Sequence, residues 1–89
     1  MEGRILIADG MPTQRIILKA RVAETGFAVD QADTLGAALR ACAAAVPDLV
    51  ILSDALDPLG GPAALTRLRA VAGMENVPII ALSDDDTRA

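Results

Sequence analysis

The sequence predicts an α/β fold in which helices cover both faces of a parallel four-stranded sheet. Short apolar stretches of the kind that form buried strands support this prediction: Arg4–Ala8, Phe27–Val29, Leu49–Leu52 and Val77–Leu82. The second strand is expected to run over Phe27–Gln31. Segments of helical character separate these stretches, and strands that alternate with helices pack as parallel strands joined by right-handed crossovers. The expected architecture is therefore a three-layer sandwich.

The first helix is predicted to begin at Pro12 or Thr13 and to run to Thr25. Proline suits a first helical turn because the N–H group that it lacks has no helical partner there. Gly26 follows as a left-handed end cap. The apolar face is expected to hold Ile16, Ile17, Ala20 and Ala23 or Glu24, and the solvent face Arg15, Lys19 and Arg21.

Two further helices are predicted between the remaining strands. Asp33 or Thr34 caps an alanine-rich helix that runs to about Ala45. The third helix is expected from Ala63 to about Val71, after a loop rich in turn-forming residues. Its core positions are expected to be Leu65, Leu68 and Ala72.

The composition is that of one small domain with an aliphatic core. Hydrophobic residues make up 53% of the 89 residues and aromatic residues only 1%. A formal net charge of −4, without a basic run, disfavours a nucleic-acid partner. No apolar run approaches the roughly 18 residues that span a membrane, and the start of the chain does not resemble a signal peptide. A cytoplasmic protein without membrane contact is therefore expected.

The absence of histidine removes histidine-based catalysis and most transition-metal sites. Cys42 is the single cysteine, which excludes an internal disulfide, and it is expected to be a small buried thiol.

Gly60 and Gly61 do not form a phosphate-binding loop, since no Lys-Ser or Lys-Thr pair follows them. An enzyme or a flavodoxin-like cofactor-binding domain is consequently the least favoured hypothesis.

Polar side chains follow three of the four predicted strands. Asp9 closes the first strand, Ser53 and Asp54 close the third, and Ser83 closes the fourth. In an open parallel sheet the ligand crevice lies beyond the carboxyl ends of the strands, where the strand order reverses. These residues, far apart in sequence, are therefore expected to converge at one edge of the sheet.

In this order of segments the chain resembles the receiver domain of two-component response regulators, the CheY-like module with a flavodoxin-like fold. The matching stretches are Arg4–Asp9, Thr34–Leu39, Pro47–Leu52, Leu59–Gly61 and Pro78–Ser83. The resemblance implies the strand order 2-1-3-4, without the last strand and the last two helices of the family's fold. It also implies that residues 1–89 form a single incomplete receiver domain, the N-terminal part of a longer multidomain regulator.

In that family an acidic pair ends the first strand, and an aspartate that ends the third accepts a phosphoryl group from a phosphohistidine. These acids bind Mg²⁺, which favours oxygen ligands and offsets the charge of phosphoryl transfer. A hydroxyl after the fourth strand contacts the phosphoryl oxygens. The resemblance therefore implies Asp9 and a third-strand acid as metal ligands and Ser83 as the phosphoryl-contact hydroxyl.

The sequence departs from this pattern at two positions. Gly10 stands where the second acid of the pair is expected, and an ungapped comparison puts Ser53 at the phosphoacceptor position. Asp54 takes that position only with a compensating insertion and deletion, although Pro58, four residues later, supports such a shift. Ser53 is favoured, because a one-residue slip turns every side chain of a packed strand to the other face. A serine cannot form the acyl phosphate on which the family relies.

The favoured hypothesis is a regulatory and interaction module with impaired aspartyl phosphorylation and weak Mg²⁺ binding at most. The alternative is a Mg²⁺-dependent phospho-accepting switch that uses Asp54 together with Asp9. The implied partners are a histidine kinase or phosphotransfer protein and the chain's own output domain, which could be enzymatic even though this domain is not expected to be. The exposed apolar fourth strand, Val77–Leu82, also predicts a homodimer.

Overall fold

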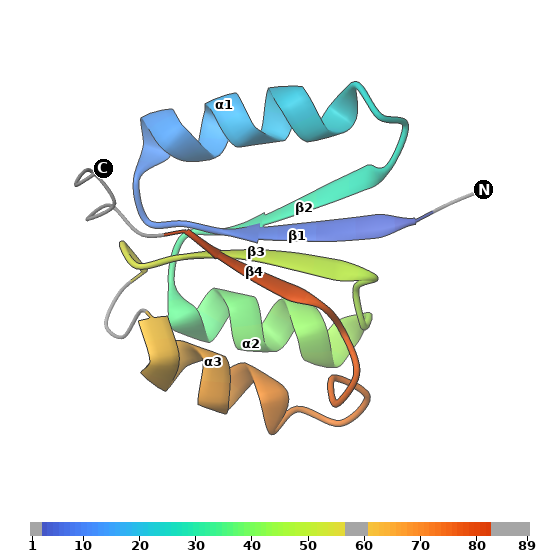
Figure 1. Ribbon diagram of the computed structural model, residues 1–89, viewed down its shortest axis with the longest axis vertical. Coiled ribbons are helices and arrows are strands. Elements are labelled where there is room, and N and C mark those ends of the chain that lie inside the picture. The colour runs from blue at the N-terminus through green and yellow to red at the C-terminus, as the bar shows by residue number, and fades with distance from the viewer. Residues whose placement is uncertain (1–2, 57–60, 83–89) are drawn as a thin grey trace.

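Figure 1 shows the computed structural model of the chain, which describes residues 3–56 and 61–82. The elements in chain order are β1 (Arg4–Ala8), α1 (Pro12–Ala23), β2 (Ala28–Ala32), α2 (Leu35–Ala44), β3 (Leu49–Ser53), α3 (Gly61–Arg69) and β4 (Ile79–Leu82). All strand pairs are parallel and the strand order is β2-β1-β3-β4. The predicted fold class and strand order are confirmed. Within the described residues, no helix is long and apolar enough to cross a membrane.

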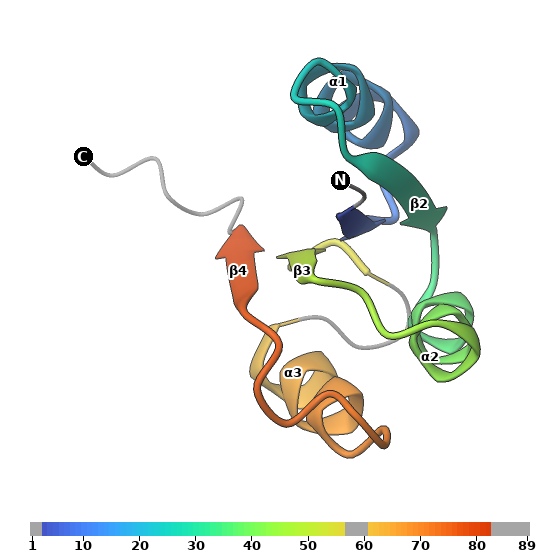
Figure 2. The ribbon, with the colours of Figure 1, turned by 90° about the vertical axis from the view of Figure 1, so that its right-hand side faces the viewer.

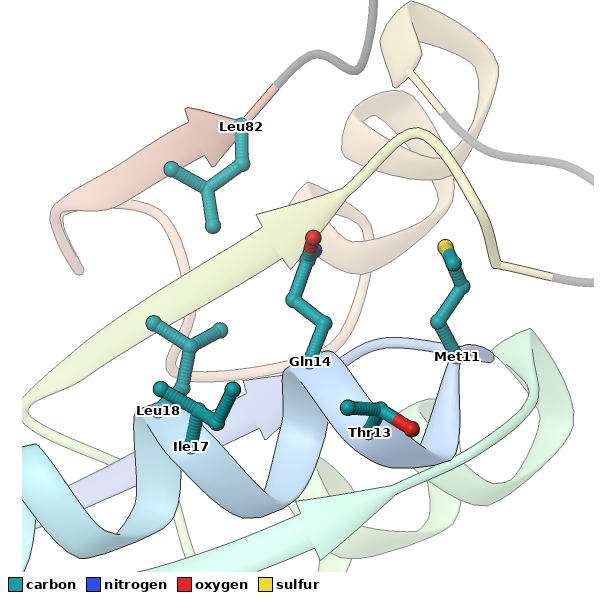
Figure 3. Close-up of a pocket in the computed structure, with 6 residues that line it drawn as sticks. All are labelled: Met11, Thr13, Gln14, Ile17, Leu18 and Leu82. Atoms are coloured by element: carbon teal, nitrogen blue, oxygen red, sulfur yellow. The ribbon is translucent and has the colours of Figure 1, made fainter.

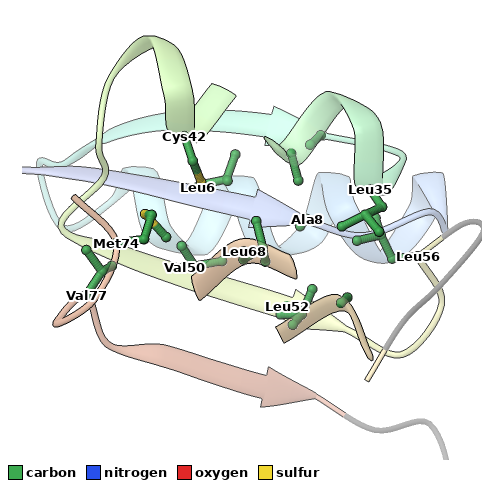
Figure 4. Close-up of a cluster of buried hydrophobic side chains, with 13 residues drawn as sticks. Leu6, Ala8, Leu35, Cys42, Val50, Leu52, Leu56, Leu68, Met74 and Val77 are labelled. Carbon is green, nitrogen blue, oxygen red and sulfur yellow. The ribbon is translucent and has the colours of Figure 1, made fainter. Parts of the chain in front are cut away.

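The two faces of the sheet are covered unequally. Figure 2 shows α1 on one face and α2 and α3 on the other. The buried core lies under α2 and α3 (Figure 4) and consists of Leu6, Ala8, Ala32, Leu35, Ala38, Cys42, Val50, Leu52, Leu56, Ala64, Leu68, Met74 and Val77. Helix α1, by contrast, contains no fully buried residue. Hydrophobic burial is therefore concentrated on one side of the sheet.

The face that α1 turns to the sheet differs from the prediction. Ile16 and Ile17 are 62% and 53% exposed, so they do not form the core-facing stripe. The half-buried residues of the helix are Gln14, Arg15, Leu18 and Val22. Arg15 donates a hydrogen bond to the backbone oxygen of Asp9 at 2.8 Å, which anchors the first turn. The half-buried face thus combines polar contacts with the apolar Leu18 and Val22, and a count of apolar residues does not detect the polar part.

The ends of the helices follow local chemistry. Pro12 is at the start of α1, and the side chain of Thr34 accepts a hydrogen bond from a backbone N–H three residues later at 3.1 Å. Gly26 has a φ of 91°, the left-handed conformation that glycine adopts without strain. These three predictions are confirmed. Ala72, which was expected at a core position, is exposed, because α3 ends at Arg69.

Cys42 lies in α2 and is wholly buried. Burial raises the pKa of its thiol, since the apolar surroundings disfavour the thiolate. A buried thiol of raised pKa is unreactive and packs as a small apolar side chain. The prediction for this residue is confirmed.

Candidate functional site

The residues that end β1, β3 and β4 lie at one edge of the sheet (Figure 1). Ala8 pairs with Leu52, so the next residues, Asp9 and Ser53, are neighbours across β1 and β3. Ser53 in turn pairs with Leu82 of β4. The structure thus brings Asp9 and Ser53 together. The predicted hydroxyl, Ser83, lies outside the described residues.

Asp9 is fully buried, and both oxygens of its carboxylate accept hydrogen bonds from the start of α1. The backbone N–H of Met11 donates to Oδ1 at 2.9 Å, and Nε2 of Gln14 donates to Oδ2 at 2.6 Å. The backbone N–H of Asp9 donates to the carbonyl oxygen of Ala32 at 2.9 Å. Asp9 therefore ties β1 to β2 and to the first turn of α1.

Gly10 lies where the chain after β3 approaches the loop between β1 and α1 most closely. Its backbone N–H donates to the carbonyl oxygen of Ala55 at 3.1 Å. A Cβ atom at Gly10 would overlap that same oxygen, so any side chain here requires the backbone after β3 to move. The missing second acid is thus accompanied by a backbone arrangement that leaves no room for it.

Ser53 and Asp54 occupy opposite environments at the end of β3. Ser53 is 1% exposed, and its Oγ accepts a hydrogen bond from the backbone N–H of Ala55 at 3.0 Å. Asp54 is exposed, and its backbone N–H donates to the carbonyl oxygen of Leu82 at 3.0 Å, which extends the β3–β4 ladder. The buried position next to Asp9 is therefore held by a hydroxyl group, while the Asp54 carboxylate is in solvent.

The acids at this edge do not form a cation site as they stand. Mg²⁺ in proteins is held by one or two carboxylates with water and phosphate oxygens. Among the described residues the one buried carboxylate is that of Asp9, which already accepts hydrogen bonds from two N–H donors, and Gly10 supplies no ligand side chain. Within residues 3–56 and 61–82, no three acidic or thiol side chains are grouped so that they could hold a metal ion. The described residues therefore do not fit the Mg²⁺ that the resemblance implies.

A hollow of about 530 Å³ lies beside Asp9, between α1 and the end of β4 (Figure 3). Its walls are formed by Met11, Thr13, Gln14, Ile17, Leu18 and Leu82. The walls are mostly apolar, and no cationic side chain lines them, so the hollow does not resemble a phosphate site. It is an apolar surface next to the carboxyl edge of the sheet.

The contacts of Gln14 and Arg15 with Asp9 do not follow from the sequence pattern. The charge pattern predicts Arg15 on the solvent face and indicates no role for Gln14. The only available signal was a pair of adjacent polar residues five and six positions after Asp9, where a first helical turn reaches back to the strand end. Both side chains are bound to Asp9, Gln14 through its carboxylate and Arg15 through its backbone oxygen.

Comparison with known proteins assigns the family. A search of curated proteins by sequence found no match. The family model of the response regulator receiver domain matches residues 5–89. Among solved structures, the fold resembles the receiver domain of the sensor histidine kinase PA1611 from Pseudomonas aeruginosa PAO1, solved with a magnesium ion in its active site cleft. That match has a TM-score of 0.88 and 24% identity and covers 100% of this chain and 73% of that one.

Two further similar structures are a response regulator and a receiver domain. TrrA from Thermotoga maritima, in complex with Mg²⁺-BeF, matches with a TM-score of 0.81 and 30% identity, over 91% of this chain and 69% of that one. The non-phosphorylated HemR receiver domain from Leptospira biflexa matches with a TM-score of 0.79 and 22% identity over 93% of this chain. The match spans 65% of the Leptospira domain's length. The chain belongs to the response regulator receiver domain family of two-component signalling.

Proposed function

We propose that this chain is a receiver domain with impaired aspartyl phosphorylation, and that it acts as a regulatory interaction module. The observation that supports this most is the burial of Ser53 at the end of β3 together with the exposure of Asp54. Phosphorylation of a serine gives a phosphate ester, which does not have the chemistry of the acyl phosphate used by the family. The domain itself is proposed to carry no enzymatic activity.

The surroundings of Asp9 support the same proposal. The carboxylate of Asp9 already accepts from the N–H groups of Met11 and Gln14, which leaves it fewer lone pairs for a cation. Adding a second acid at Gly10 would require the backbone at Ala55 to move. Because the carboxylate of Asp9 is partly satisfied and no second acid fits beside it at Gly10, weak or absent Mg²⁺ binding is the proposed state.

Receiver domains interact with histidine kinases or phosphotransfer proteins. For this chain we propose that contact with its own output domain, in the cytoplasm, carries the regulatory function, with phosphoryl transfer weakened or lost. The hollow between α1 and β4 and the half-exposed Ile17 and Ile80 offer apolar surface for such a contact.

Beryllofluoride with Mg²⁺, or acetyl phosphate with Mg²⁺, is expected to leave the thermal midpoint and the amide NMR spectrum unchanged. The reason is that the buried position at the end of β3 offers a hydroxyl rather than a carboxylate. The variant Asp54→Asn is expected to behave like the unchanged chain. A receiver domain that responds to beryllofluoride under the same conditions is the positive control. A response that disappears in Asp54→Asn would refute the proposal and establish the alternative switch on Asp54.

We also propose that the 89-residue chain associates through β4. This strand pairs with β3 alone among the described strands, and Ile80 is 50% exposed. An unpaired strand edge with apolar side chains is a template for pairing with another chain. Light scattering after size-exclusion chromatography is expected to show a dimer or a larger species. The variant Ile80→Lys is expected to shift the population towards the monomer. A stable monomer at high concentration contradicts this prediction.

A further inference from the structure

The contact between Gln14 and Asp9 is the shortest hydrogen bond at the carboxyl edge of the sheet. Nε2 of Gln14 lies 2.6 Å from Oδ2 of Asp9, slightly closer than is usual for N–H···O bonds, and bonds to an ionised acceptor are the shorter ones. Gln14 is half-buried in the first turn of α1, and its side chain extends from the helix between Met11 and Leu82 (Figure 3). Its amide is therefore held at the mouth of the apolar hollow.

A buried carboxylate requires hydrogen bonds or a paired cation, because its charge is otherwise poorly solvated. Asp9 meets this requirement with neutral donors: the amide of Gln14 on one oxygen and the backbone N–H of Met11 on the other. Arg15 is the neighbouring cation, but its Nη1 donates to the backbone oxygen of Asp9. In this part of the structure a neutral amide thus contacts the carboxylate oxygen that a metal ion would approach.

We propose that Gln14 substitutes for the cation at Asp9, so that the loop from β1 to α1 is fixed without metal. This inference rests on the proposed function, which takes Mg²⁺ binding at Asp9 to be weak or absent. It adds a specific contribution to that weakness: the amide group of Gln14 occupies an oxygen of the Asp9 carboxylate. Gln14 is a positioning residue in this role.

The decisive variant is Gln14→Glu, which keeps the shape of the side chain and replaces the donor amide by a carboxylate. Two carboxylates at the present separation of Nε2 and Oδ2 repel each other without metal and form an acid pair that Mg²⁺ can bridge. We expect its thermal midpoint to fall by about 4–8 °C and to recover when 10 mM MgCl₂, on the order of a saturating concentration, replaces NaCl of equal ionic strength. The unchanged chain is expected to show no such dependence.

The variant Gln31→Glu is the matched control, because it makes the same chemical change at an exposed residue that contacts Arg15 from β2. It is expected to show no response to Mg²⁺. Gln14→Leu, which removes the amide and adds no charge, is expected to lower the midpoint with no recovery in Mg²⁺. Broadening of the amide signals of residues 9–11, 13 and 14 by Mn²⁺, in Gln14→Glu alone, would locate the cation at this edge.

The outcomes separate the inference from the proposed function. If the unchanged chain is itself stabilised by Mg²⁺, the proposed impairment of the site is wrong. If the unchanged chain is inert and Gln14→Glu is inert too, the inference about Gln14 is wrong while the proposed function stands. If Gln14→Glu does not fold with or without Mg²⁺, Gln14→Leu decides: a lowered midpoint supports the inference, and an unchanged midpoint overturns it.

Discussion

Replacing Ser53 by aspartate is expected to lower the free energy of unfolding by about 3–5 kcal/mol in the absence of divalent cations. This is the cost of a buried charge that has no partner of opposite charge, about 3–5 kcal/mol. Ser53 is 1% exposed and lies next to Asp9 across β1 and β3. The new carboxylate would be buried beside an existing one. Two buried carboxylates that lie side by side repel each other, and burial prevents water from solvating both.

The measurement is urea unfolding of Ser53→Asp with and without Mg²⁺. Divalent cation is expected to restore part of the lost stability, because a second carboxylate beside Asp9 supplies a metal ligand that the chain lacks. Ser53→Asn is the matched control: it has a similar size and no charge, so its smaller loss should not depend on Mg²⁺. If Ser53→Asp is as stable as the unchanged chain in metal-free buffer, the position is not the buried neighbour of Asp9 described above.

The strands and their parallel arrangement could be predicted because they depend on local patterns. Buried parallel strands are apolar along their whole length, and turn-forming residues separate them from the helices. The ends of β1 and β3 agree with the prediction to within one residue. The strand order came from the family resemblance, since a pattern of apolar residues does not by itself say which strands are neighbours.

The rotation of α1 could not be predicted, because it depends on how the helix docks on the sheet. Leu18 and Val22 are half-buried beside Gln14 and Arg15, whereas Ile16 and Ile17 are exposed. Apolar residues lie on both the half-buried and the exposed side of the helix, so their pattern does not identify the face that contacts the sheet. Because no residue of α1 is fully buried, the spacing of apolar residues in its sequence is a weak guide to the rotation of the helix.

The candidate site shows the same division between local and tertiary information. The sequence identifies Asp9, Ser53 and Asp54 as strand-end residues, and alternation along a strand favours opposite environments for the last two. The partners of the Asp9 carboxylate depend on how α1 docks, and the lack of space at Gly10 depends on where the backbone of Ala55 passes. Both are tertiary features, which no spacing of residues encodes.

Replacing Asp9 by alanine is expected to lower the free energy of unfolding by about 2–4 kcal/mol, since a buried acceptor is removed and its donors lose their partner. The carboxylate joins β1 to α1 through Met11 and Gln14, so its loss also loosens the first turn of the helix. If Asp9 were retained only to hold a cation, Asp9→Ala would raise the free energy of unfolding in metal-free buffer, because it would remove an unpaired buried charge.

Asp54→Ala is the matched control for this measurement, because it removes a carboxylate from an exposed position at the same edge of the sheet. Its effect is expected to stay within about 0.5 kcal/mol, as for most surface substitutions. Urea unfolding in EDTA gives both values under identical conditions. A gain in stability for Asp9→Ala would mean that the carboxylate strains the fold and is retained for a ligand. A loss of stability in Asp9→Ala but not in Asp54→Ala means that the main role of the Asp9 carboxylate is to join the helix to the sheet. This role explains why the edge of the sheet can remain folded without a metal ion.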